Sequence, residues 1–165
     1  MIRAITTFGF VGLLRPAPGT WGSAAAIMLG VAIDHLLGFP ALVVATVAVT
    51  ALGFWACEQA LRDHPGEDPS EIVIDEVAGQ WLALLFPAAA FWSRGMEDWW
   101  LTAYPGWVAA FVFFRLFDIW KPSVIGWADR RSDSKGVMLD DLFAGLFAGV
   151  ATIIAAGIAH GVLMR

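Results

Sequence analysis

Apolar residues gather into five long runs along this chain, and short polar stretches separate them. The runs cover Ala24 to Leu37, Ala41 to Cys57, Val77 to Trp92, Ala103 to Phe117 and Leu142 to Met164. A transmembrane helix needs about 20 predominantly apolar residues, and a shorter run reaches that length only with help from flanking residues. The pattern therefore predicts an all-α, multi-pass membrane bundle of about five to six helices, in a single domain over residues 1–165.

The stretch before the first run is predicted to be irregular. Arg15 to Gly19 contains two prolines and a glycine, which favour an extended, turn-rich chain over a helix. Thr20 or Ser23 is the expected N-cap of the first helix. The first 20 residues lack an apolar core long enough for a signal peptide, so membrane insertion is expected to depend on the internal runs.

The overall composition supports a membrane protein. Hydrophobic residues make up 59 % of the chain and charged residues 15 %, whereas a soluble domain has about 45–50 % and about 25 %. The net charge of −5 and the lack of a basic stripe argue against a nucleic-acid partner. The single cysteine, Cys57, cannot form an internal disulfide.

The distribution of charge predicts an orientation. If all five runs cross the bilayer, one side carries eight of the ten Lys and Arg residues and the other carries Arg94 and Arg165. Positive charge marks the cytoplasmic side, so the N-terminus and the connectors 58–76 and 118–141 are expected there. The third and fourth runs are short, and a half-inserted hairpin is the alternative to two full crossings. The eight Lys and Arg residues on the predicted cytoplasmic side are Arg3, Arg15, Arg62, Arg115, Lys121, Arg130, Arg131 and Lys135.

Two acidic doublets lie on that same side. Asp75-Glu76 precedes the third run, and Asp140-Asp141 precedes the fifth. A carboxylate at a helix start can simply complement the helix dipole, but this role does not require two adjacent acids, which repel each other. Four carboxylates form an oxygen-donor set that suits Mg²⁺. Neither Cys57 nor the scattered histidines have the spacing of a zinc site.

Cationic residues accompany these acids. At helical spacing Arg115 and Asp118 share a face, and Asp118 and Lys121 do likewise. They form either an ion-pair ladder at a helix end or a site with a metal-directed acid and two phosphate-binding cations. Thr20 and Ser23 begin the first helix, where N–H and hydroxyl groups either cap the helix or bind an anion. Residues 129–136 are interpreted as a solvated loop that faces lipid headgroups.

Carboxylates for a divalent cation, beside Arg and Lys, favour phosphoryl chemistry. The chain contains no G-x-x-x-x-G-K-[ST] loop, no G-x-S-x-G elbow and no H-E-x-x-H motif, so nucleotide-driven and serine-triad mechanisms lose support.

The motifs together resemble the phosphatidylglycerophosphatase A family. The resemblance rests on four motifs in order, which cover most of the chain: Ala17-Pro18-Gly19-Thr20 with Gly22-Ser23, Ile72 to Val77 with Gly79, Phe114 to Pro122, and Gly136-Val137-Met138 with Asp140-Asp141 and Ala144-Gly145. It implies a helical bundle in which a central helix is surrounded by others. It also implies a Mg²⁺-dependent phosphatase of the bacterial inner membrane that converts phosphatidylglycerophosphate to phosphatidylglycerol during phospholipid biosynthesis.

The resemblance places the family's acidic residues on Asp75, Glu76, Asp118, Asp140 and Asp141, and together with the pattern of charges it predicts roles for individual residues. Asp75, Glu76, Asp140 and Asp141 are expected to bind one or two Mg²⁺ ions. Asp118 is expected to ligate the metal or orient the attacking water, so that Asp118, Asp75 and Asp141 form the catalytic set. Arg115 and Lys121 are expected to hold the phosphate, supported by Thr20 and Ser23. The residues also leave two other functions open, a divalent-cation transporter that uses membrane carboxylates and a bundle that only binds anionic lipid.

Overall fold

Five long helices form the protein, and they correspond to the five apolar runs of the sequence. The computed structural model describes residues 1–62, 69–96, 98–131 and 133–163, and these ranges contain helices but no strand. The all-α bundle is therefore confirmed. Residues 63–68, Glu97, Ser132, Met164 and Arg165, which belong to the predicted connectors and runs, lie outside the described residues. The long helices are α2 (Pro18–Leu37), α3 (Phe39–Ala60), α4 (Ile74–Trp92), α6 (Pro105–Trp120) and α8 (Ser134–Leu163).

Helices α2 and α8 begin six or more residues before the apolar runs that predicted them. Helix α2 begins at Pro18, because proline needs no N–H partner and suits the first turn of a helix. Its N-cap is Ala17, so the expected cap by Thr20 or Ser23 is wrong. Helix α8 begins at Ser134 rather than Leu142, which places Asp140 and Asp141 in its second turn instead of a connecting loop. A simple helix-dipole role explains this doublet poorly, because the dipole acts mainly on the first turn.

Short helical elements that the sequence did not predict complete the fold. They are α1 (Ile2–Thr6), the 3₁₀ turn η1 (Val11–Leu13), α5 (Trp99–Thr102) and α7 (Val124–Asp129). Helix α1 packs on α3 and holds the segment just before α4, because the Val73 N–H donates to the Thr6 carbonyl at 2.8 Å. An ion pair between Arg3 and Glu71 at 3.3 Å joins the same two segments.

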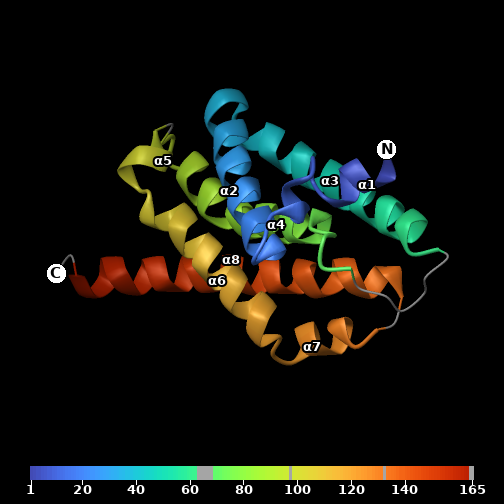
Figure 1. The fold of residues 1–165 in the computed structure, drawn as a ribbon. Helices are drawn as coiled ribbons and strands as arrows, with labels where there is room; N and C mark the ends of the chain where they lie inside the picture. The colour runs from blue at the N-terminus through green and yellow to red at the C-terminus, as the bar shows by residue number, and fades with distance from the viewer. Residues whose placement is uncertain (63–68, 97, 132, 164–165) are drawn as a thin grey trace.

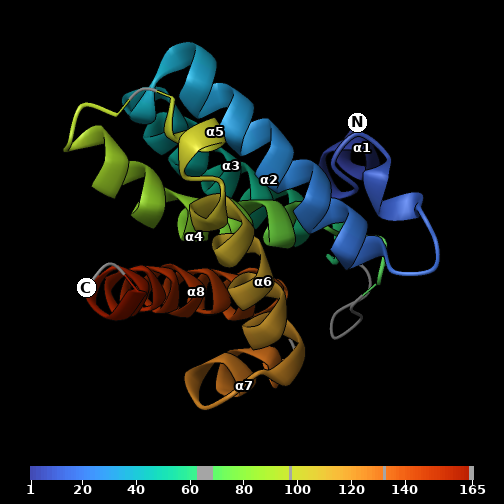
Figure 2. The same cartoon turned by 90° about the vertical axis from the view of Figure 1, so that its left-hand side faces the viewer.

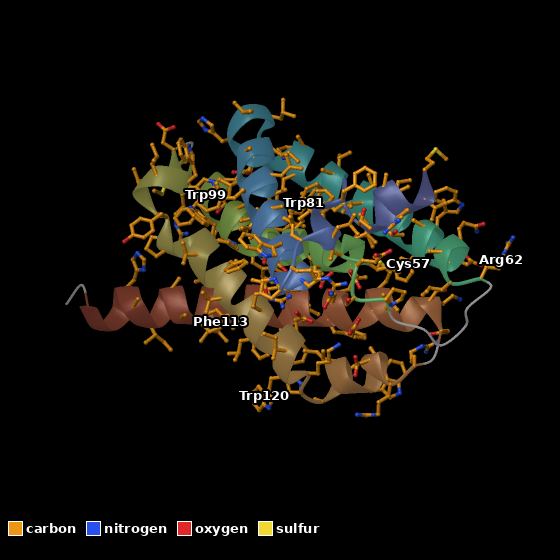
Figure 3. The ribbon with its side chains drawn as sticks, in the orientation of Figure 1. Cys57, Arg62, Trp81, Trp99, Phe113 and Trp120 are labelled. Carbon is orange, nitrogen blue, oxygen red and sulfur yellow. The ribbon has the colours of Figure 1, made fainter. Side chains whose placement is uncertain are left out.

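Helix α4 is the central helix. It packs against α2, α3, α6 and α8, and it lies between the α2–α3 pair and α8 in both views (Figures 1 and 2). Most of its side chains are buried. Trp81 points from α4 toward α2, where its Nε1 donates to the Ala26 carbonyl at 2.7 Å (Figure 3). The resemblance had implied such a central helix.

Glycines bring α4 and α8 unusually close. A Cβ atom on Gly145 would overlap the carbonyl of Gly79, and one on Gly149 would overlap the ring of Phe86. The Gly145-x-x-x-Gly149 pattern therefore acts as a helix contact, as small residues do in membrane bundles. This backbone contact lies one turn beyond Asp141, so it holds the acids of α8 against those of α4.

Three of the described helices are long and apolar enough to cross a membrane: α2, α3 and α8. Helices α4 and α6 are not among them by the same measure. The crossing of all five helices therefore stays a prediction.

Candidate active site

A cavity of about 280 Å³ lies where the starts of α2, α4 and α8 meet the end of α6. All four of these helix ends carry residues that the sequence singled out, although they are far apart along the chain. The cavity is lined by Ala17, Pro18, Gly19, Thr20, Ser70, Ile72, Asp75, Glu76, Arg115, Asp118, Ile119, Lys121, Val137, Asp140 and Asp141.

An acidic cluster occupies one wall of this cavity. Asp75 and Glu76 from α4 and Asp141 from α8 each offer a carboxylate oxygen, and these oxygens lie within 4.8 Å of one another. Asp75 and Asp141 are buried, and Glu76 is partly buried. The two doublets that the sequence identified are thus brought together by the α4–α8 contact, and three of their four acids form one cluster.

The electrostatics of the α4 acids reflect this crowding. Burial, followed by the nearby charges of Asp141 and Asp118, raises the pKa of Glu76 to about 8. Burial, followed by the charge of Glu76, also raises the pKa of Asp75 well above its usual value. One oxygen of Glu76, Oε2, is buried without a hydrogen-bond partner. A buried carboxylate with an unused oxygen beside two other acids is the arrangement that a bound cation would satisfy.

Arg115 and Asp118 extend the site from α6. The Arg115 Nη1 forms an ion pair with Asp118 Oδ2 at 2.5 Å and donates to the hydroxyl of Ser23 at 3.3 Å. Ser23 in turn donates to the Gly19 carbonyl at 2.8 Å. Both contacts of Arg115 use Nη1, so the Nη2 donors of the guanidinium are left for a further ligand. The Nε is buried without a partner.

Lys121 reaches the cavity because the chain turns sharply after α6. Lys121 ends that helix in the left-handed conformation, with φ of 49°. Its Nζ contacts Asp140 Oδ2 at 2.6 Å and Asp129 Oδ1 at 2.5 Å. Burial alone would lower the pKa of Lys121, but its hydrogen bonds to Asp129 and Asp140 raise it above the usual value. The ammonium group therefore stays charged.

Asp140 differs from the other three acids of the doublets. One of its oxygens is held by Lys121, and the other accepts the Asp141 N–H at 3.0 Å. Asp140 lines the cavity but lies outside the three-residue cluster. A cation that bound Asp140 Oδ2 would therefore share this oxygen with the Lys121 ammonium group.

A comparison with known protein families identifies the family to which this chain belongs. The family model described as "Phosphatidylglycerophosphatase A" matches residues 4–156, which is nearly the whole chain. The chain belongs to the phosphatidylglycerophosphatase A family. It is therefore a phosphatase, and the matched residues include every residue that the sequence assigned to the site.

Relatives of the chain carry related names. It is 36 % identical to phosphatidylglycerophosphatase A of Haemophilus influenzae over 83 % of this chain and 77 % of that protein. It is 35 % identical to phosphatidylglycerophosphatase A of Escherichia coli over 92 % of this chain and 78 % of that protein. A Bacteroides thetaiotaomicron protein, provisionally named a phosphatidylinositol-3-phosphatase, is 36 % identical over 84 % of this chain and 83 % of its own length. No solved structure matches the chain.

In this phosphatidylglycerophosphatase A family member, the N-terminal motif around Gly19, Thr20 and Ser23 lies at the cavity. Thr20 lines the cavity, whereas Ser23 is fully buried behind it and touches Arg115. A Cβ on Gly19 would overlap Glu76 Oε1 and lie 3.3 Å from Arg115 Nη1. Glycine is therefore required at this position so that an acid and a base can approach the start of α2.

Sequence reasoning missed several members of the site. Asp129 holds Lys121 but belongs to a stretch interpreted as a solvated loop, and no local spacing indicates the contact. Ile72, Val137 and Ile119 supply apolar parts of the wall. All three lie within the motifs that carry the family resemblance, but their apolar side chains were assigned no role there.

Proposed function

We propose that the protein is a Mg²⁺-dependent phosphatase that hydrolyses phosphatidylglycerophosphate to phosphatidylglycerol and phosphate. The observation that carries the proposal is the meeting of three carboxylates, from Asp75, Glu76 and Asp141, with Arg115 and Lys121 in one cavity. The names of the relatives from Haemophilus influenzae and Escherichia coli supply the substrate. Formation of phosphatidylglycerol would place the reaction in phospholipid biosynthesis.

The residues of the cluster fit Mg²⁺. All their donor atoms are carboxylate oxygens, which this hard cation prefers. The unpartnered Oε2 of Glu76 and the raised pKa of the same group indicate a carboxylate that needs a positive neighbour. Asp75, Glu76 and Asp141 would hold the ion, with Asp140 as a further ligand shared with Lys121. Bound there, Mg²⁺ would supply Lewis-acid polarisation of the phosphoryl group.

The phosphate group would be bound by the cationic wall opposite the acids. Arg115 has unused donors on its guanidinium, and Lys121 has one N–H beyond its two contacts with acids. Thr20 adds a hydroxyl and the start of α2 adds backbone N–H groups. Ser23 would act indirectly, because its hydroxyl fixes Arg115 from behind.

Hydrolysis needs a water aligned with the phosphorus and a path for its proton. Asp118, which pairs with Arg115 and lies beside Asp141, would accept a hydrogen bond from that water and orient it. The water oxygen forms the new bond to phosphorus as the bond from phosphorus to the glycerol oxygen breaks. The proton lost by the water ends on the glycerol oxygen. Arg115 and Lys121 would offset the charge that develops on the phosphoryl oxygens.

We place the site at the cytoplasmic face of a bacterial inner membrane. Helices α2, α3 and α8 have membrane length, and the relatives are bacterial. The cavity lies at the helix ends beside most of the Lys and Arg residues, which favours the cytoplasmic side.

A phosphate-release assay on the purified protein tests the proposal. Phosphatidylglycerophosphate, phosphatidic acid and phosphatidylinositol 3-phosphate would be compared in mixed micelles, with Mg²⁺ and with a chelator. We expect release from phosphatidylglycerophosphate to be fastest and to stop with the chelator. Faster release from either of the other lipids would show that phosphatidylglycerophosphate is not the preferred substrate. Release that continues in the chelator would show that the reaction does not require Mg²⁺. Mg²⁺ uptake into proteoliposomes without any phosphate release would support the transporter instead.

A further inference from the structure

Ile119 joins the cavity to the outer surface of the bundle. It lines the cavity beside Asp118, yet its own side chain is 72 % exposed. The other cavity-lining residues with exposed positions are Ala17 and Ser70, among the described residues. The mouth of the cavity therefore passes Ile119 at the end of α6.

An apolar stripe continues from Ile119 along α6. Val108, Val112 and Leu116 are exposed and lie at helical spacings of three or four residues from one another and from Ile119, so they share one face of the helix. Trp120, next to Ile119, points away from the bundle at the same end of α6 (Figure 3). Apolar surface therefore extends without a charged side chain from the cavity mouth along the outside of α6.

The other part of the mouth is polar. Ser70 is exposed there, and its hydroxyl accepts a hydrogen bond from Arg15 at 3.3 Å. The mouth thus has an apolar part at Ile119 and a polar part at Ser70, which Arg15 contacts. A cavity mouth that is apolar in one part and polar in another suits a substrate with one charged end and one apolar end.

We propose that the acyl-bearing part of the substrate leaves the cavity over Ile119 and lies along the stripe formed by Val108, Val112, Leu116 and Ile119. This inference rests on the proposed function, which places the phosphate between Arg115 and Lys121. Arg115 and Ile119 are four residues apart on α6 and share a face, so the glycerol linked to a phosphate at Arg115 passes Ile119 next. Ile119 is then a specificity-determining residue that favours long-chain lipid esters over short-chain ones.

The experiment compares two forms of phosphatidylglycerophosphate, dihexanoyl and dioleoyl, with purified protein in mixed micelles. The measured quantity is the ratio of kcat/KM for the dioleoyl form to that for the dihexanoyl form. We expect Ile119→Asn to lower this ratio about tenfold, the scale of a lost apolar contact with the substrate. Ile119→Leu keeps an apolar side chain and should keep the ratio.

Ile158→Asn is the matched control, because Ile158 is also an exposed isoleucine but lies near the far end of α8. It should leave the ratio unchanged, and the thermal midpoints of all variants in detergent report that they are folded. An unchanged ratio in Ile119→Asn, or an equal drop in Ile158→Asn, would overturn the proposal while the proposed function stands. Wild-type protein that releases no phosphate from either form would refute the proposed function, and this inference with it.

Discussion

Glu76 and Asp141 come from different helices, yet oxygens of their carboxyl groups lie within 4.8 Å of each other. If both groups were ionised, they would repel by about 3 kcal/mol at an effective dielectric of about 20. The contact between Gly79 and Gly145 forces this proximity, because the two helix backbones meet one turn away. The fold therefore holds together acids that repel one another when ionised, and a bound cation would offset this repulsion.

Removing one acid of the cluster should abolish both catalysis and metal binding. We expect Asp141→Asn to lower phosphate release about 1,000-fold, the scale of losing a main electrostatic element of an active site. Saturating Mg²⁺ should raise the thermal midpoint of the wild type, because a ligand that binds only the folded state stabilises it. The same addition should not stabilise Asp141→Asn.

Asp98→Asn is the control for this experiment, since Asp98 is exposed just before α5, outside the cavity. It should keep both activity and the response to Mg²⁺. Near-normal turnover in Asp141→Asn would contradict the assignment of Asp141.

The raised pKa of Glu76 predicts how stability depends on pH without metal. The group has a pKa of about 8 in the folded protein and 4.5 as its reference value, so the folded state binds its proton more tightly. The stabilisation is complete below about pH 4.5 and is lost as the pH rises toward 8. Thermal midpoints measured in chelator should therefore fall across this window.

Mg²⁺ should reverse this trend, because the ion favours the ionised carboxylate. Glu76→Gln cannot lose a proton at this position, so its midpoint should vary less with pH than that of the wild type. The pKa of Asp75 is also raised, so part of the pH dependence of the thermal midpoint should remain in Glu76→Gln. A wild-type midpoint that rises between pH 5 and 8 in chelator would show that Glu76 is ionised in the folded protein.

The long helices and the site acids were predictable because their signals are local. An apolar run identifies a helix wherever it lies, and an acidic doublet at the edge of such a run is unusual enough to mark Asp75, Glu76, Asp140 and Asp141. Arg115 and Asp118 were predictable for the same reason, since their spacing of three residues puts them on one face of α6. Lys121 was expected to continue that face, but it lies just beyond the end of the helix and pairs with Asp129 and Asp140 instead of Asp118.

The contacts among these residues were not predictable, because they depend on how the helices pack. The ion pair of Lys121 with Asp129 requires the left-handed turn after α6, which nothing in the sequence announces. The separation of Asp140 from the cluster also depends on Lys121. The early starts of α2 and α8 were missed because Pro18 was taken as a helix breaker and residues 134–141 as a loop.

Lys121 should contribute to binding the phosphate, and Asp129 should contribute little. We expect Lys121→Met to lower kcat/KM about 100-fold, because it removes a cation from the phosphoryl site. Asp129→Asn should change kcat/KM by less than about threefold, since Asp129 is exposed and its ion pair is screened by solvent. Lys135→Met, at an exposed lysine in the first turn of α8, is the matched control. Equal effects of Lys121→Met and Lys135→Met would mean that only general positive charge matters.

Asp140→Asn distinguishes the two roles that remain for Asp140. Phosphate release should fall strongly in either case, because Asp140 holds Lys121 at 2.6 Å. Retained stabilisation of this variant by Mg²⁺ would place Asp140 with Lys121 in the phosphate-binding wall. Loss of that stabilisation would place it among the metal ligands.

Gly19→Ala should impair the reaction more than the fold. The added methyl would overlap Glu76 Oε1 and crowd Arg115 Nη1, so the Glu76 carboxylate must shift from its present position beside Asp75 and Asp141. The moving group is the flexible end of a side chain, so the thermal midpoint in chelator should change little, whereas misplacing a catalytic group by about 1 Å can lower kcat about 100-fold. Gly157→Ala is the control, because a methyl on this residue of α8 meets no atom within 4 Å. If Gly19→Ala kept wild-type kcat and Mg²⁺ affinity, the position of the Glu76 carboxylate would not matter to the site.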